Sequence, residues 1–108
     1  MLKHIVIWKF KDHAEGADRA ANIVKAKALL EGCAHLVPGT LRFEVVTAQP
    51  GLEASADLML DSEFADADAL QAYLDHPQHL ALKPFLGAVR ERRECMDYLL
   101  SATAPMPA

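Results

Sequence analysis

The segment K-H-I-V-I-W-K-F, Lys3 to Phe10, limits the possible folds more than any other part of the chain, because it is apolar on both faces. Successive residues of a strand point to opposite faces of a sheet, and β-branched and aromatic residues favour strands. One face would carry His4, Val6, Trp8 and Phe10, and the other Ile5 and Ile7. We therefore predict a strand near the middle of a sheet.

A helix is predicted from Asp18 to Leu36 by apolar residues that recur at spacings of three and four. Pro38 and Gly39 end it, because proline lacks an amide donor and glycine permits a reversal of the chain. Alternating apolar residues then predict strands over 41–45 and 58–64. The turn-forming segment Q-P-G-L-E-A-S between them favours an antiparallel hairpin.

The remaining third of the chain predicts a second helix, a broken region and a last strand. Asp66 is a suitable N-cap, and the helix is expected to end near Asp75, since proline disfavours helical geometry in the residue before it. Pro77 suits the first position of a short helix, and Pro84 interrupts the chain again. A turn region would run to about Arg92, and E-C-M-D-Y-L-L would form the last strand.

The order β-α-β-β-α-β predicts an α+β fold of the ferredoxin-like type, with helices on one face of a four-stranded antiparallel sheet. The other face would carry both apolar and charged side chains, so we expect a second copy of the chain to cover it, giving a dimeric α+β barrel. Residues 1–100 form the predicted domain, and 101–108 a flexible tail. The expected core comprises Ile5, Val6, Ile23, Leu30, Phe43, Leu60, Leu70, Leu74 and Phe85.

Composition excludes several classes of partner. Fifteen acidic residues against eleven basic ones give a formal charge of -4, and R-E-R-R at Arg90 to Arg93 is better explained as a solvated helix end than as a nucleic-acid site. No apolar run approaches the roughly 18 residues of a membrane span. We expect a soluble cytoplasmic protein in which Cys33 and Cys95 are reduced thiols of the core.

The segment Y-L-D-H-P-Q-H places a phenol and two imidazoles close together. On an unbroken helix, Tyr73 and His79 would lie about 240° apart around the axis, but a break at Pro77 can bring them to one face. Neutral histidine can accept a proton from carbon beside a carbonyl, and a phenol can stabilise the resulting enolate. The alternative is that Tyr73 and His79 lie at the edge of the core, hydrogen-bonded to each other or to the backbone.

Two further histidines have competing interpretations. His4, on the inner face of the first strand, is either a catalytic or binding group or a hydrogen-bonded core residue. His76 either binds a ligand, or caps the short helix or faces solvent. Together with His79 they could offer three imidazoles to a metal. The break in the chain separates His76 from His79, so we predict neither a metal nor a cofactor.

Several motifs resemble the stress-responsive A/B barrel domain (Dabb) family. They are K-H-I-V-I-W-K-F-K, P-G followed by F-E-V-V, S-E-F-A-D-A-D-A-L-Q-A-Y-L-D-H-P-Q-H and M-D-Y-L. The resemblance extends from about Leu2 to Leu100 and implies a dimeric α+β barrel. Most bacterial members of the family have no assigned reaction, so the resemblance alone names no substrate.

The resemblance also implies roles for individual residues. In a plant member that cyclises a linear polyketide, the catalytic tyrosine and histidine correspond to Tyr73 and His79, and a pocket histidine to His4. Another pocket histidine corresponds to Leu58, and a pocket leucine to Trp8, so this chain departs from the cyclase at both positions.

The predicted site is thus a small apolar pocket. Its catalytic candidates are His79, Tyr73 and His4, and its binding candidates are Trp8, Leu58, Val6 and His76. The pocket would take a small hydrophobic or carbonyl ligand. Two functions stay open: a cofactor-free cyclase, lyase or isomerase, and a non-catalytic homodimeric module for ligand binding or stress response.

Overall fold

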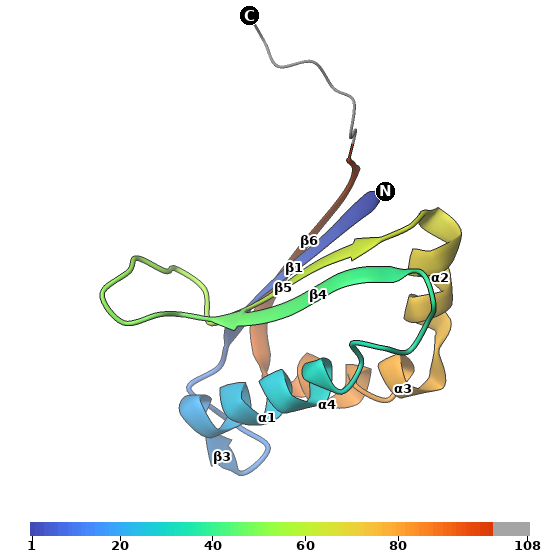
Figure 1. The fold of residues 1–108 in the computed structure, drawn as a ribbon. Helices are drawn as coiled ribbons and strands as arrows, with labels where there is room; N and C mark the ends of the chain where they lie inside the picture. Colours follow the sequence, from blue (N-terminus) through green and yellow to red (C-terminus); the bar gives the residue numbers. More distant parts are fainter. Residues whose placement is uncertain (101–108) are drawn as a thin grey trace, which may run out of the picture.

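The computed structural model describes residues 1–100 and contains a four-stranded antiparallel sheet. The strands are β1 (Leu2–Phe10), β4 (Thr40–Thr47), β5 (Leu58–Phe64) and β6 (Arg90–Leu99), in the order β4-β5-β1-β6. The predicted ferredoxin-like fold is confirmed, and β1 lies between two other strands as expected (Figure 1). The tail predicted for 101–108 lies outside the described residues.

The helices α1 (Arg19–Glu31), α2 (Ala67–Asp75), α3 (Pro77–Leu80) and α4 (Lys83–Val89) cover one side of the sheet (Figure 1). Asp18 and the predicted Asp66 are the N-caps of α1 and α2, because their carboxylates accept backbone amides at 2.9 and 2.8 Å. The first helix ends at Glu31 rather than near Leu36, because Gly32, with its low helix propensity, follows and closes the last turn.

A short hairpin precedes α1 and was not predicted from the sequence. It pairs β2 (His13–Ala14) with β3 (Ala17–Asp18). Glu15 and Gly16 form the turn with φ angles of 52° and 73°, the positive values that a two-residue hairpin of type I′ needs at both positions. The E-G pair therefore marks a turn between two strands rather than a simple loop.

The last strand begins earlier than predicted. β6 follows α4 directly at Arg90, so R-E-R-R lies in a strand and not at a helix end. Within residues 1–100, β6 is an edge strand that pairs only with β1, and nearly all its side chains are exposed. It therefore lacks the apolar alternation that would have revealed it. For the same reason Cys95 is exposed, and its assignment to the core was wrong, whereas Cys33 is buried.

The core lies between the sheet and the helices. Four of its predicted members are buried there: Val6, Leu30, Leu60 and Leu70. Four others pack against this core while partly buried: Ile23, Phe43, Leu74 and Phe85. Ile5 was wrongly placed, because the alternation of β1 puts it on the opposite face, where it is half-buried.

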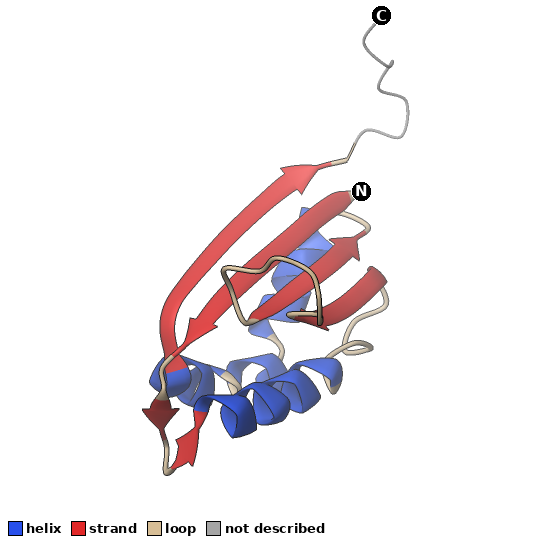
Figure 2. Ribbon diagram, turned by 90° about the vertical axis from the view of Figure 1, so that its left-hand side faces the viewer, coloured by secondary structure: helices blue, strands red, loops and turns tan. Residues whose placement is uncertain are grey.

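The face of the sheet opposite the helices is mixed in character. Its apolar members Ile5, Ile7, Val46 and Met59 are half-buried at most. Asp61 lies among them and forms ion pairs with Lys3 at 2.7 Å and with Arg42 at 3.0 Å. Figure 2 shows the β4–β5 loop crossing in front of this face, with α2 behind the sheet.

Gly39 marks the tightest approach of the chain to a helix. A Cβ added there would lie 2.4 Å from the Ala69 Cβ of α2, whereas one added to Gly87 in α4 would meet nothing within 4 Å. We expect Gly39→Ala to lower the free energy of unfolding by about 1–3 kcal/mol through overpacking. Gly87→Ala is the matched control and should be neutral or stabilising by about 0.4–1 kcal/mol. Urea unfolding measures both; equal effects would contradict the close packing of Gly39.

A candidate active site between the sheet and the helices

A cavity of about 330 Å³ lies between the sheet and the helices. Five predicted site residues line it: His4, Val6 and Trp8 from β1, Tyr73 from α2 and His79 from α3. The other lining residues are Leu30, Leu60, Leu82, Lys83, Leu86, Arg90 and Arg93. The site residues predicted from the sequence thus include the wall members from β1, α2 and α3. They do not include the remaining lining residues, among them the basic residues of α4 and β6.

The break before Pro77 brings His79 to Tyr73. Their ring centroids lie 4.7 Å apart, although an unbroken helix would turn them away from each other. His79 Nδ1 is 2.9 Å from the carbonyl oxygen of Leu74. Because a carbonyl oxygen can only accept, Nδ1 carries the hydrogen, and Nε2 of the neutral ring keeps its lone pair.

Burial lowers the pKa of His79 below its usual value, and electrostatic effects of the nearby Lys83, His4 and Arg93 act in the same direction. The hydrogen bond with the Leu74 carbonyl opposes this effect but does not outweigh it. The imidazole is therefore neutral near pH 7 and able to accept a proton.

Tyr73 lines the same cavity as His79. Burial strongly raises the pKa of its hydroxyl, with a smaller contribution from Cys33, so the group stays protonated and can donate a hydrogen bond. Within residues 1–100 the hydroxyl has no hydrogen-bond partner, and the same is true of the Trp8 indole nitrogen. Since buried polar groups are nearly always paired, two unpaired groups on residues that line one cavity are unusual.

His4 is buried and held by its neighbours on β6. Its Nδ1 lies 2.5 Å from the Asp97 carboxylate, which faces it across the β1–β6 pairing, and its ring centroid is 6.4 Å from that of Tyr73. This arrangement agrees with a hydrogen-bonded core histidine and also positions the ring beside Tyr73. Asp97 was not singled out from the sequence, because only the strand register brings it to His4.

Two binding candidates lie elsewhere. His76 does not line the cavity; it caps α3, because its Nδ1 accepts the Gln78 amide at 3.1 Å. Leu58 is buried in the core and lines a different pocket. The backbone explains both positions, since His76 precedes the helical turn and Leu58 sits at the far end of β5, opposite Trp8.

One group of side chains could hold a metal ion. His4, Cys95 and Asp97 each offer a ligand atom, and these atoms lie within 4.8 Å of one another. The same atoms are satisfied by each other, because Asp97 accepts from the Cys95 thiol at 3.7 Å as well as bonding His4. In the part of the chain that the structure describes, His4, His76 and His79 do not form such a group.

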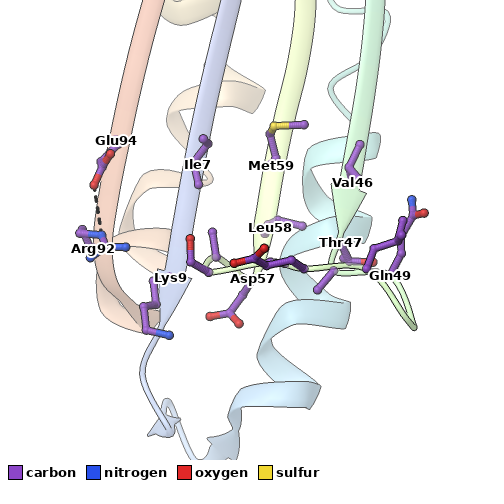
Figure 3. A pocket seen from close by; sticks show the side chains of 16 residues that line it. Ile7, Lys9, Val46, Thr47, Gln49, Asp57, Leu58, Met59, Arg92 and Glu94 are labelled. Carbon is purple, nitrogen blue, oxygen red and sulfur yellow. Dashed lines mark ion pairs between the residues drawn. The ribbon is translucent and has the colours of Figure 1, made fainter.

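A second, more open pocket of about 570 Å³ lies on the other face of the sheet, under the β4–β5 loop. Figure 3 shows Ile7, Val46 and Met59 side by side on three neighbouring strands, with the Arg92–Glu94 ion pair at one edge. The residues around this pocket include no histidine or tyrosine. Its apolar floor and paired charges suit contact with another surface better than proton transfer.

The fold and the first cavity define a ferredoxin-like α+β protein with a cavity between sheet and helices that is lined by Tyr73 and His79. Residues 2–100 match the stress responsive A/B barrel domain, and the chain belongs to this family (Dabb). No curated protein matches the chain in sequence. None of the helices in residues 1–100 has the length and apolar character needed to cross a membrane.

Solved structures resemble the chain over nearly its whole length. A dimeric protein of unknown function from Bacteroides fragilis is 27% identical, with a TM-score of 0.76 over 92% of this chain and 95% of its own. A Dabb family protein from Mesorhizobium loti is 24% identical, with a TM-score of 0.65 over 94% and 97%. SnoaB, a cofactor-independent oxygenase from Streptomyces nogalater, is 17% identical, with a TM-score of 0.69 over 97% of each chain, and shares the fold.

The lowered pKa of His79 gives a pH prediction. In the unfolded chain the pKa of histidine is near 6.5, whereas the folded protein favours the neutral His79 ring. This preference contributes fully to stability above pH 6.5. The contribution is lost as the pH falls through the lower pKa of the folded state. NMR titration of the His79 ring should give a midpoint below 6.5. Stability should also fall less between pH 7 and 5 in His79→Gln than in the parent. A midpoint at or above 6.5 would contradict the burial of this ring.

Proposed function

We propose that the cavity binds a small carbonyl compound and transfers a proton from the carbon beside its carbonyl. The observation that carries this proposal is the position of His79, which the break at Pro77 sets against Tyr73 with Nδ1 bonded to the Leu74 carbonyl. Nε2 of a neutral ring is thereby available as a base. No cofactor is needed for this chemistry.

In the proposed reaction, His79 Nε2 accepts the carbon-bound proton, and negative charge develops on the carbonyl oxygen. The Tyr73 hydroxyl, protonated because burial raises its pKa, donates a hydrogen bond to that oxygen. His4 borders the same space and is held by Asp97, so it can orient the substrate. The enolate can then attack a second carbonyl, expel a leaving group or be reprotonated, which correspond to cyclase, lyase and isomerase outcomes.

A non-catalytic ligand-binding or stress-response module is the alternative. It is favoured by the apolar wall of the cavity, because Val6, Leu30, Leu60, Leu82 and Leu86 could hold a hydrophobic ligand without any reaction. Both functions use the same space, and they differ in whether His79 and Tyr73 change the ligand. The cytoplasmic location expected from the sequence stays a prediction.

Proton exchange tests the catalytic proposal directly. In D₂O the protein should speed the loss of the ¹H NMR signal of hydrogens beside the carbonyl of a small ketone such as 2-octanone. Tyr73→Phe and His79→Gln should each slow this exchange by about 10²- to 10⁴-fold while leaving the fold intact. His35→Gln, which removes an exposed histidine, is the control. Binding of the ketone without any exchange would favour the non-catalytic module.

We also propose a homodimer in which the open faces of two sheets pack together. The Bacteroides fragilis relative and a Jannaschia relative, 27% and 26% identical, are dimeric, and the mixed face that carries Ile7 and Met59 suits such an interface. Light scattering at micromolar concentration should report about twice the 11.8 kDa chain mass. Met59→Glu should lower that mass, because it places a charge in the interface; a monomeric parent would exclude the barrel.

A further inference from the structure

We infer that the ligand of the cavity is a small keto carboxylate, whose carboxylate binds the basic residues at the cavity edge while its apolar part enters between sheet and helices. This inference rests on the proposed function, because it adds a substrate class to the same site. The residues that carry it are Lys83, Arg90 and Arg93, which the proton-transfer step itself does not use.

The sign of the charge around the cavity is opposite to that of the whole chain. The chain has a formal charge of -4, yet among residues 1–100 the cavity is lined by three lysine or arginine side chains and by no carboxylate. Asp97, which bonds the His4 ring, is not among the lining residues. A cleft lined by charges of one sign concentrates ligands of the opposite sign, so this one favours anions.

Lys83, Arg90 and Arg93 also differ from several other basic residues in the fold, because those residues are paired with carboxylates. In the described part of the chain, four lysine or arginine side chains form ion pairs with carboxylates: Lys3, Arg19, Arg42 and Arg92. Within residues 1–100, Lys83, Arg90 and Arg93 form no ion pair, so their charges are free to bind a ligand. Arginine matches the two oxygens of a carboxylate in a planar, bidentate geometry.

The exposure of the lining residues indicates how such a ligand would be oriented. Lys83 and Arg93 are exposed, whereas Val6, Leu60 and Tyr73 are buried. A carboxylate would therefore stay at the outer, basic edge, and an alkyl chain would occupy the apolar interior. His79 is half-buried between these two environments, where it can reach a carbonyl in the middle of the ligand. The cavity volume of about 330 Å³ is at the lower end for small-molecule sites and limits the ligand to a short chain.

The fluorescence of Trp8 provides the readout, because it is the one tryptophan in the sequence and it lines the cavity. The probes are 4-oxononanoate and its uncharged amide, 4-oxononanamide, which have nearly the same shape. We expect the acid to bind about 10-fold more tightly than the amide at low salt, since hydrogen bonds to charged groups are the stronger ones. Added salt should reduce this preference.

Two substitutions test which basic residues bind the carboxylate of the ligand. Arg93→Gln and Lys83→Gln should each weaken binding of 4-oxononanoate by about 3- to 10-fold and leave binding of the amide unchanged. Arg92→Gln is the matched control, because Arg92 is the neighbouring residue on β6, pairs with Glu94 and lines the other pocket. It removes the same charge from the opposite face and should not change the preference, provided that light scattering shows an unchanged mass.

The outcomes separate this inference from the proposed function. Equal binding of acid and amide, or variants at Arg93 and Lys83 that behave like the Arg92 variant, would overturn the carboxylate assignment and leave the carbonyl site standing. Tighter binding of octyl phosphate than of 4-oxononanoate would overturn it in favour of a phosphorylated ligand. Failure of both keto probes to bind would overturn the assignment and count against the proposed function as well.

Discussion

The hydrogen bonding of β1 on both of its edges is the constraint on which the rest of the structure depends. β1 pairs with β5 over residues Leu2 to Trp8 and with β6 over Leu2 to Phe10. A strand held on two sides has little freedom to shift its register, and a shift of one residue would exchange its two faces. The position of His4, Val6 and Trp8 in the cavity is therefore fixed by backbone pairing and not by the cavity itself.

The opposite wall of the cavity depends on a defect in a helix. α2 and α3 are separated because Pro77 cannot donate an amide and disfavours helical geometry at His76, which is extended with a ψ of 134°. A rigid strand and a broken helix thus contribute the two sides of one site. This combination lets His4 and Tyr73 keep fixed positions while the short α3 places His79 beside Tyr73.

Sequence reasoning found the parts of this protein that local patterns determine. The alternation in Lys3 to Phe10 predicted β1 and which of its side chains face the helices. Pro77 predicted the break that brings Tyr73 and His79 together. It could not find Asp97 or Arg93, because both lie on an edge strand without apolar alternation and meet the site only through pairing with β1. The wrong placement of Cys95 has the same cause. Long-range register, and not local propensity, decides which residues of β6 face the cavity.

Through the cap of α3, the hydrogen bonding of His79 depends on His76, a residue that does not line the cavity. In a continuous helix the Gln78 amide would bond the Leu74 carbonyl, but here it bonds His76 Nδ1, and the carbonyl is left for His79. A residue without an acceptor at position 76 would release that amide to compete for the carbonyl, and His79 would lose the partner that fixes its tautomer. Comparing only cavity-lining residues among related chains would miss this dependence, because two chains with the same tyrosine and histidine can differ in which ring nitrogen is free.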